Sequence, residues 1–421
     1  MRQRNGTAVF PKDLQFYKFC GYGFFKNLRF FDPFILLFFR ETGLSFLQIG
    51  LLFSIREASV NLLEIPTGLI ADTVGRRRAM LTSFSAYLLS FGFFYLWGHL
   101  FWLSAAGMVL YGLGDTFRSG THKAMILEYL KQKGYQHLKV EYYGRTRSCS
   151  QLGSAISSLV AASLVFYYGS FRVVFLASII PYLIDLALLY SYPKNLDGEI
   201  SRHPFSFKKL KVFTKESFRQ ILNNLHLRNT LLCSAMGGAV FKISKDYIQP
   251  FLKKWAVALP LFLGLQANKR TALLIGLVYF VIYILTSQAS RHSGTLRNKI
   301  GTSARALNGY YIANTMVYLG IGVFVWLGFY LPALLCFLGI FLIQNLQRPL
   351  MVGYVGEVTD SDRMATVLSV ESQSRSLLVS MIAPLMGFLV DSFGVGGGFI
   401  GISFILLVIY PFIKIPASAH S

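Results

Sequence analysis

Long apolar blocks separated by short polar connections dominate the chain. Uninterrupted runs include 79–97, 272–285, 309–341 and 396–413. A helix needs about 20 predominantly apolar residues to cross a hydrocarbon core that is about 30 Å thick. The blocks do not alternate every second residue, as the strands of a membrane barrel do. The pattern therefore predicts an all-α membrane protein.

The blocks and the breaks between them predict about twelve transmembrane helices of about 20 residues each. Their expected ranges are 16–39, 47–70, 79–99, 102–122, 149–168, 171–192, 230–251, 271–290, 306–328, 331–352, 365–390 and 396–415. The longest polar connection, 193–228, divides them into an N-terminal six-helix half (1–192) and a C-terminal six-helix half (229–421). We expect this connection to be a cytoplasmic linker, either an amphipathic segment in the headgroup plane or a flexible tether.

The charge of the chain adds an orientation. Lys and Arg number 41 against 19 Asp and Glu. They gather before the first expected helix and after the second, fourth, sixth and eighth, whereas the connections after the third and ninth hold none. The positive-inside rule then places both termini in the cytoplasm, beneath a plasma (inner) membrane. Basic residues between apolar blocks contact anionic headgroups, so we expect membrane lipids and not nucleic acid as partners.

The connection between the second and third expected helices carries a distinctive run, GLIADTVGRR at 68–77. Gly68 and Gly75 allow close helix approach and a tight turn. Asp72 can accept hydrogen bonds from the amides that open the next helix. Arg76 and Arg77 stay at the cytoplasmic surface and can reach helix C-termini across the interface between the halves.

This run resembles the loop signature of the major facilitator superfamily (MFS), Gly-x-x-x-Asp-x-x-Gly-Arg-Arg. The number of spans and the central linker extend the resemblance to nearly the whole chain. It implies the MFS fold, whose two halves rock against each other to give alternating access. The equivalent connection in the second half, 290–294, lacks the Asp. The same Gly-x-x-x-Asp-x-x-Gly skeleton recurs at 387–394, where we interpret it as the end of a helix.

A short internal repeat supports two related halves. The first expected helix contains FKNLRFFDPF at 25–34, and the seventh contains FKISKDYIQPF at 241–251. The fourth and tenth expected helices each carry one arginine, Arg118 and Arg348. Because corresponding helices of the two halves line one central site, these four helices are expected to share a cavity.

Charged side chains within the expected helices are costly, so they face the bundle interior, pair with one another or line water. Pairs at helical spacing, such as Glu371 with Arg375, are expected to hold the bundle together. The basic residues outnumber the acidic ones, and surplus positive charge in a watery cleft attracts anions. The predicted substrate ligands are Lys26, Arg29, Arg118, Lys242, Lys245 and Arg348. A desolvated carboxyl group can exchange a proton near neutral pH, and the candidates for proton coupling are Asp32, Glu57, Glu64, Asp115 and Asp246.

The sequence therefore predicts a secondary active transporter, a symporter or antiporter, that moves a small anionic organic solute as a monomer. One alternative is a proton-coupled multidrug exporter, which predicts an apolar cavity with one or two carboxyls. Another is an MFS-like scaffold or receptor that no longer transports. An enzyme is not expected, because the seven histidines show no metal or nucleophile spacing. The sequence has no Walker-type phosphate loop, and we expect no cofactor.

Overall fold

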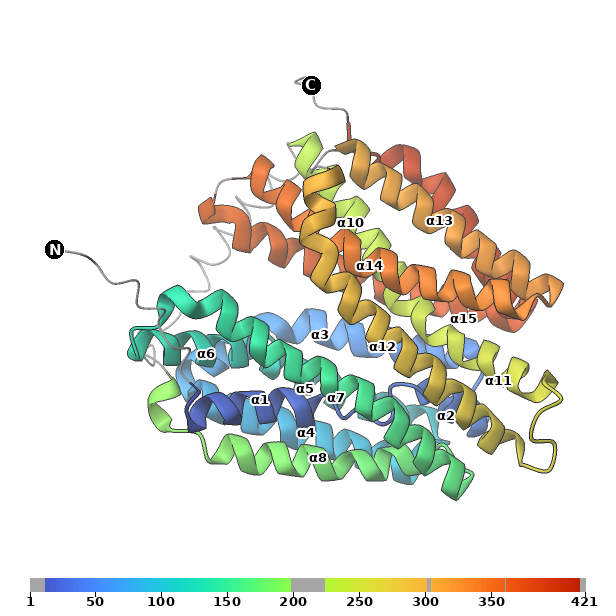
Figure 1. The fold of residues 1–421 in the computed structure, drawn as a ribbon, viewed down its shortest axis with the longest axis horizontal. Helices are drawn as coiled ribbons and strands as arrows, with labels where there is room; N and C mark the ends of the chain where they lie inside the picture. Colours follow the sequence, from blue (N-terminus) through green and yellow to red (C-terminus); the bar gives the residue numbers. More distant parts are fainter. Residues whose placement is uncertain (1–11, 198–223, 301–303, 360, 417–421) are drawn as a thin grey trace, which may run out of the picture.

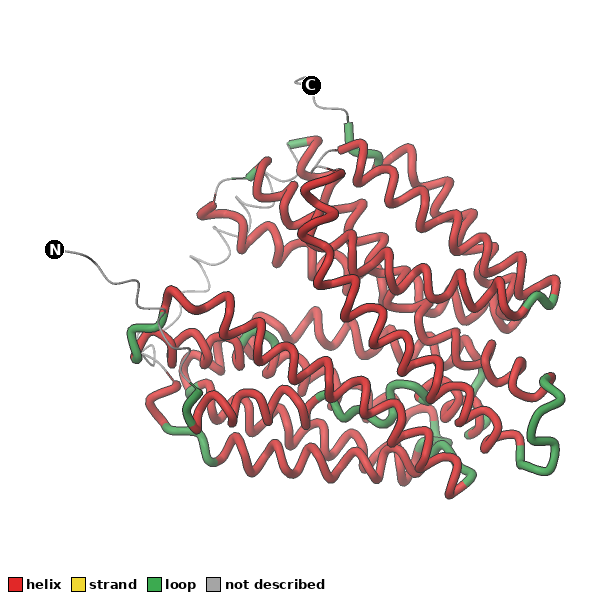
Figure 2. Tube along the Cα trace, in the orientation of Figure 1, coloured by secondary structure: helices red, strands yellow, loops and turns green. Residues whose placement is uncertain are grey.

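The computed structural model describes residues 12–197, 224–300, 304–359 and 361–416. Figures 1 and 2 show a bundle of long helices joined by short turns. Most of the expected linker at 193–228, including its amphipathic stretch, lies outside the described residues. The side chains of the connection at 290–294 also lie outside them.

Two groups of helices make up the bundle (Figure 1). The N-terminal group comprises α1 (Leu14–Lys26), α2 (Ile35–Glu41), α3 (Phe46–Val74), α4 (Arg76–Trp97), α5 (Phe101–Arg118), α6 (Thr121–Gln132), α7 (Lys139–Tyr168) and α8 (Val173–Tyr190), with the short turns η1 (Gln136–Leu138) and η2 (Lys194–Asp197). The C-terminal group comprises α10 (Leu225–Ser244), η3 (Lys245–Tyr247), α11 (Ile248–Ala258), α12 (Ala267–Ile300), α13 (Ala304–Leu327), α14 (Tyr330–Val358) and α15 (Ser361–Ile413). Gly394, at φ 72°, divides α15 into the last two expected spans.

Eight of the described helices are long and apolar enough to cross a membrane, and α15 is one of them although it covers two spans. The expected spans absent from this set are the first, fourth and seventh. Those three contain Lys26 and Arg29, Asp115 and Arg118, and Lys242 and Lys245, respectively. The first is absent because its helices α1 and α2 have only 13 and 7 residues. The helices α5 and α10 are long enough, and charged residues such as Asp115, Arg118 and Lys242 lower their apolarity.

The first and seventh expected helices are each broken, which corrects their prediction as continuous spans. In the first, α1 ends at Lys26 and α2 begins only at Ile35. In the seventh, the 3₁₀ turn η3 separates α10 from α11. Both breaks fall just after the repeated Phe-Lys pair. A broken helix leaves backbone groups without partners, and inside a membrane the protein itself must satisfy them.

Gln249 of α11 satisfies backbone groups of the first break from the other half. Its side-chain oxygen accepts a hydrogen bond from the amide of Leu36 at 2.9 Å. Its side-chain nitrogen donates to the carbonyl oxygen of Asp32, also at 2.9 Å. Since Gln249 is fully buried, this exchange joins the two breaks through a dry contact between the halves.

Several further boundaries differ from the expected ones. The fourth helix stops at Arg118 instead of 122, because Gly120, at φ 76°, turns the chain into α6. The fifth begins at Lys139, ten residues before its expected start at 149. The seventh continues to Ala258, so its last turns contain two lysines that were expected to follow it. Charged and polar helical turns that project beyond the apolar core explain the last two differences.

The halves meet along two antiparallel helix pairs. In the first pair, α3 runs beside α15, and Ser54 Oγ donates to the carbonyl oxygen of Ser380 at 2.5 Å. Further along the same pair, Asn61 Nδ2 donates to the carbonyl oxygen of Gln373 at 2.8 Å. In the second pair, α7 packs on α12. We call the end of the molecule where α1 begins and α15 ends the termini end, and the opposite end the far end.

The two halves are in tight contact at the far end. The carboxylate of Asp391 on α15 accepts hydrogen bonds from the amides of Phe46 and Leu47, which open α3, at 3.0 and 2.7 Å. Beside this cap, Gly387 lies against the backbone of Phe46 so closely that a Cβ atom would overlap its carbonyl oxygen. Asn268 of α12 also donates to Glu41 at 2.7 Å. The 387–394 run, expected to be only a helix end, is therefore also a contact between the halves.

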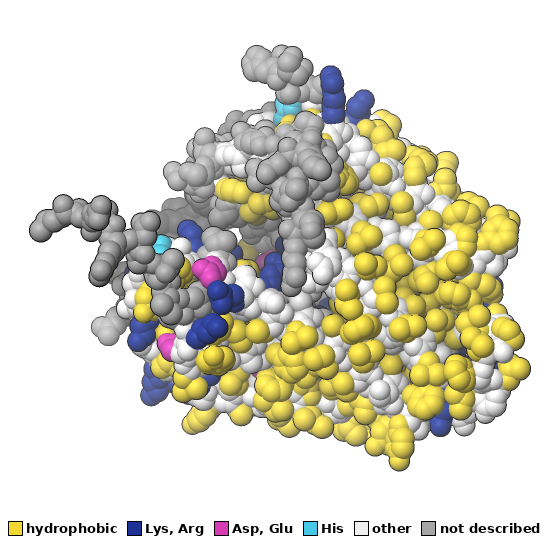
Figure 3. All heavy atoms as spheres, in the orientation of Figure 1, with side chains coloured by type: hydrophobic (Ala, Val, Ile, Leu, Met, Phe, Trp, Pro, Cys, Tyr) yellow, Lys and Arg dark blue, Asp and Glu magenta, His cyan; other side chains and the backbone are white. Residues whose placement is uncertain are grey.

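The exterior is apolar in the way that lipid contact requires. Large hydrophobic side chains on several helices are exposed, among them Leu62, Leu277 and Phe404. Figure 3 shows hydrophobic side chains over most of one face, with charged ones gathered mainly toward the termini end. A soluble protein rarely exposes apolar patches of this extent.

Candidate functional site

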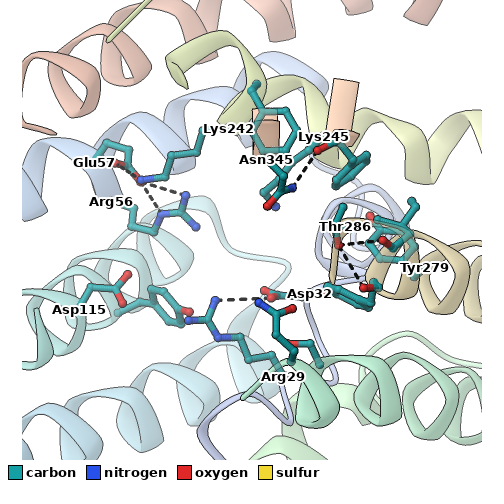
Figure 4. Close-up of a pocket in the computed structure, with 17 residues that line it drawn as sticks. Arg29, Asp32, Arg56, Glu57, Asp115, Lys242, Lys245, Tyr279, Thr286 and Asn345 are labelled. Carbon is teal, nitrogen blue, oxygen red and sulfur yellow. Dashed lines mark hydrogen bonds and ion pairs between the residues drawn. The ribbon is translucent and has the colours of Figure 1, made fainter. Parts of the chain in front are cut away.

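A central cavity of about 350 Å³ lies between the two groups of helices. Figure 4 shows its side chains converging from both groups. It is lined by Arg29, Asp32, Arg56, Glu57, Tyr111, Asp115, Gln151, Ser154, Phe241, Lys242, Lys245, Tyr279, Ile282, Tyr283, Thr286, Phe341 and Asn345. Four of these residues are basic, three are acidic, and three are tyrosines. Such a wall suits a polar solute more than a lipophilic one.

Glu57 joins the halves at the centre of the molecule. Its carboxylate is 1% exposed and lies 3.0 Å from Arg56 on its own helix and 2.6 Å from Lys242 on α10. Without these partners a buried carboxylate would be strongly destabilising. Lys242 is thus held by an acid here, and a substrate anion would have to compete with Glu57 for it.

Asp115 in the cavity wall and Asp246 next to it also have basic partners. Asp115 accepts hydrogen bonds from Tyr87 at 2.6 Å and from Arg118 at 3.1 Å. Asp246 is buried behind the wall and lies 2.6 Å from Lys245.

Arg29 is the least occupied of the cations in the central cavity. Its only described acidic partner, Asp32, lies 3.5 Å away, which is a weak contact. Its Nε is buried and has no hydrogen-bond partner in the described structure. A guanidinium with unused donors is the group best suited to a carboxylate or phosphate.

A larger cavity of about 1410 Å³, which we call the vestibule, continues from the central cavity toward the termini end. The two share Gln151, Phe241, Lys242, Lys245 and Asn345. Six basic side chains line the vestibule, and its described lining contains no acid. These six are Lys123, Arg147, Lys242, Lys245, Arg348 and Arg375. Because they come from both halves, an anion entering the vestibule meets basic side chains from each half.

The predicted site residues divide between these places. Arg29, Lys242 and Lys245 line the central cavity with Asp32, Glu57 and Asp115, whereas Arg348 lines the vestibule. Lys26, Arg118 and Glu64 line neither cavity, and Asp246 lies behind Lys245. The helices of Arg118 and Arg348 correspond in the repeat, but the two side chains occupy different surroundings. Their roles as ligands or coupling groups stay predictions.

Sequence reasoning did not select several residues of the site. Arg56 in the central cavity, and Lys123, Arg147 and Arg375 in the vestibule, line the cavities without having been chosen as ligands. Arg147 was counted among the basic residues of the connection after the fourth expected helix. Only the helical continuation of α7 back to Lys139 brings Arg147 into the vestibule.

The loop at 68–77 lies at the termini end, between α3 and α4. Gly75, at φ 103°, makes the turn that was expected there. The hydrogen bond to the amide in the first turn of α4 has a different acceptor from the expected one. The amide of Arg77 donates to Asp197 of η2 at 2.6 Å and not to Asp72. Arg76 lies 3.9 Å from Glu128 on α6, and Arg77 covers the ring of Tyr190. Both arginines thus contact their own half in this conformation instead of reaching across the interface.

Replacing Asp197 with alanine is expected to destabilise the start of α4. The substitution removes a charge-assisted hydrogen bond at a helix N-terminus, which is worth about 1 kcal/mol. The unfolding temperature of the purified protein in detergent should fall measurably. Asp72→Ala, which removes an exposed acid three residues before Gly75, should leave it nearly unchanged. An equal loss in the two variants would contradict the assignment of the cap to Asp197.

Comparisons with known proteins agree with the architecture. The profile of the Major Facilitator Superfamily matches residues 19–384. The MFS-type transporter YxaM of Bacillus subtilis (strain 168), itself uncharacterised, is 21% identical over 383 residues, which cover 90% of this chain and 89% of YxaM.

Solved structures with the same fold include the nucleoside transporter NupG and the peptide transporter POT in complex with sulfate. NupG has a TM-score of 0.73 at 10% identity, covering 95% of this chain and 96% of NupG. POT has a TM-score of 0.63 at 16% identity, covering 98% of this chain and 96% of POT. At these identities the likeness shows the fold alone. With the family profile matched over most of its length, the chain is a multi-pass integral membrane protein that belongs to the major facilitator superfamily of secondary transporters.

Proposed function

We propose that the protein is a secondary active transporter of a small organic anion. The observation that carries the proposal is the vestibule, whose described lining holds six basic side chains and no acid. Three of the six, Lys242, Lys245 and Arg375, pair with acids outside this lining, whereas Lys123, Arg147 and Arg348 form no ion pair in the described structure. Beyond the vestibule, Arg29 lines the central cavity, and its guanidinium has only the weak 3.5 Å contact to Asp32. An anion would be drawn in by the first feature and bound by the second.

The proposal includes an orientation in the membrane and a transport cycle. With both termini in the cytoplasm of a plasma (inner) membrane, the vestibule opens inward and the far end is the closed outer side. Substrate would leave or enter the cytoplasm through the vestibule, and rocking of the two halves would expose the cavity to the outside. Proton coupling through an acid of the cavity is part of the proposal, and Asp32, with its weak contact to Arg29, is the best placed of them.

Uptake into proteoliposomes tests the substrate class. Labelled inorganic phosphate, a phosphate ester, a dicarboxylate, a neutral sugar and a lipophilic cation can be offered at equal concentration. We expect saturable transport of one of the anions and none of the cation. Transport restricted to lipophilic cations would support the multidrug exporter instead. Absence of transport together with tight binding of a ligand would support a receptor.

Removing the vestibule charges by Arg147→Ala with Arg348→Ala should weaken apparent affinity for the anion roughly tenfold, since focused positive potential raises local anion concentration. Added salt should weaken the apparent anion affinity of the wild-type protein more than that of the double variant, because screening removes the same electrostatic attraction. Arg145→Ala is the matched control: this exposed residue of α7 pairs with Glu141 and does not line the vestibule. Equal salt dependence in all three proteins would contradict the role of the vestibule.

A further inference from the structure

Asp185 is an acid that the transport site described above does not use. It lies on α8, an apolar helix that can cross the membrane, and its side chain is fully buried. Neither of its carboxylate oxygens has a hydrogen-bond partner in the described structure. The other carboxyl side chains buried in the described part of the chain are those of Glu57, Asp246 and Glu371, and each of them has a basic partner.

An isolated carboxylate in an apolar interior costs far more free energy than the neutral acid. Several kcal/mol separate the two forms even after relaxation. Asp185 is therefore held with a proton in this conformation. A buried acid without a partner is rarely needed for packing, and an ionisable residue inside a membrane helix more often serves a pathway.

The groups around Asp185 include one potential counter-ion. Lys26, the last residue of α1, is the charged side chain that acts on Asp185 electrostatically. Tyr182, one turn before Asp185 on α8, donates to the carbonyl oxygen of Lys26 at 3.5 Å, so this face of α8 meets the end of α1.

The remaining neighbours of Asp185 are uncharged. Tyr22 of α1 and Tyr192, which follows α8, are its other titratable neighbours. The helices α4 and α7 also pack on α8, and neither places a described acid or base within ion-pair distance of Asp185. On α4, the hydroxyl of Tyr87 is already used by Asp115.

Lys26 also stands at the edge of the break in the first span. The non-helical segment 27–34 follows it directly, and Arg29 in this segment lines the central cavity. Although α1 and α8 belong to the same half, the break lets the Lys26 end of α1 shift against α8 without unwinding a continuous helix when the halves rock. Such a movement can bring the ammonium within ion-pair distance of Asp185 and let cavity water approach.

We propose that Asp185 and Lys26 form a proton-binding site of the transport cycle. In the conformation described here the carboxyl of Asp185 carries the proton. In the other conformation its O–H bond breaks, the proton passes to water in the central cavity, and the carboxylate that remains pairs with the Lys26 ammonium. This inference rests on the proposed function, because a proton bound and released in each cycle is what couples solute movement to a proton gradient.

Infrared spectroscopy of the full-length protein in lipid tests the site without any substrate. The wild type should show the C=O stretching band of a protonated carboxyl that disappears as pH rises. Asp185→Asn should lose this band. Asp115→Asn, the matched control inside the same half, should keep it, because Asp115 is already paired with Arg118. Lys26→Gln should move the disappearance to higher pH by roughly one unit, or about tenfold in proton affinity, since the favourable ammonium is gone.

Three outcomes would overturn the site: survival of the band in Asp185→Asn, a band that never titrates, and an unchanged titration in Lys26→Gln. If Asp185→Asn does not fold, the Lys26→Gln titration decides alone. The measurement is independent of solute transport. Loss of the site would leave the proposed anion transporter in place, with Asp32 as its candidate for proton coupling. Failure of all anion uptake with the band intact would contradict the anionic substrate and leave the proton-binding site standing.

Discussion

Replacing Gly387 with valine is expected to stop transport while leaving the cavity able to bind its anion. Gly387 and Gly50 are the points where α15 and α3 cross at the far end, and a Cβ at Gly387 would overlap the backbone of Phe46. Backbone atoms of two packed helices cannot move aside as a flexible side chain can. The overlap should cost about 3 kcal/mol, which is roughly a hundredfold change in the population of the conformation closed at the far end.

The measurement pairs transport with a distance. Spin labels placed on the α2–α3 and α11–α12 turns should report separation of the far end in Gly387→Val, with transport reduced in parallel. Gly92→Val is the control, because a Cβ at Gly92 of α4 meets no other atom within 4 Å. Asp391→Ala removes only the two hydrogen bonds to α3. It should increase the same label-to-label distances, but by less than Gly387→Val does. Normal transport by Gly387→Val would show that the two helices need not approach this closely during the cycle.

The sequence predicted the number of the spans because apolar runs are local signals. It also pointed to the first, fourth and seventh helices through their charges. It could not predict that the first and seventh would break at the same point of the repeat. That outcome depends on Gln249, whose bonds to Leu36 and to Asp32 join positions more than two hundred residues apart.

The 387–394 run could be interpreted from the sequence only as a helix end, because its contact with α3 is not a local signal. Its glycines and acid are typical of a helix end, and Gly394 does break α15. The acid also caps α3, and the two helices of this contact carry the same skeleton at opposite ends, at 68–75 on α3 and at 387–394 on α15. Nothing local to either run indicates which amides it meets.

Buried charge was the hardest feature to interpret from the sequence. Charges in the spans could be counted, but their pairing could not, and pairing decides which of them remain available. Glu57, a candidate for proton coupling, proves to be the shared partner of Arg56 and Lys242. Asp185 was not selected, although an acid within an apolar span is itself a signal, and only the structure shows that its surroundings contain no partner.

Pairing also identifies the cation whose loss should matter most, which is Arg29. Lys242 and Lys245 are held by Glu57 and Asp246 at 2.6 Å each, whereas Arg29 has only its 3.5 Å contact to Asp32. Arg29→Ala should lower the transport efficiency for the anion at least about thirtyfold, because removing one partner of a buried charge pair costs 2 kcal/mol or more. Arg29→Lys should show an intermediate loss, since it keeps the charge and loses the bidentate fork.

One competing explanation of such a loss is that Asp32, left without its partner, repels the anion. The double variant Arg29→Ala with Asp32→Ala separates the two, because it removes the stranded acid together with the arginine. If Arg29 binds the anion directly, the double variant remains as impaired as Arg29→Ala. Recovery of transport in the double variant would instead assign Arg29 the lesser role of neutralising Asp32. In that case the vestibule cations Arg147 and Arg348, which face no described acid in the lining, would be the stronger candidates for direct contact with the anion.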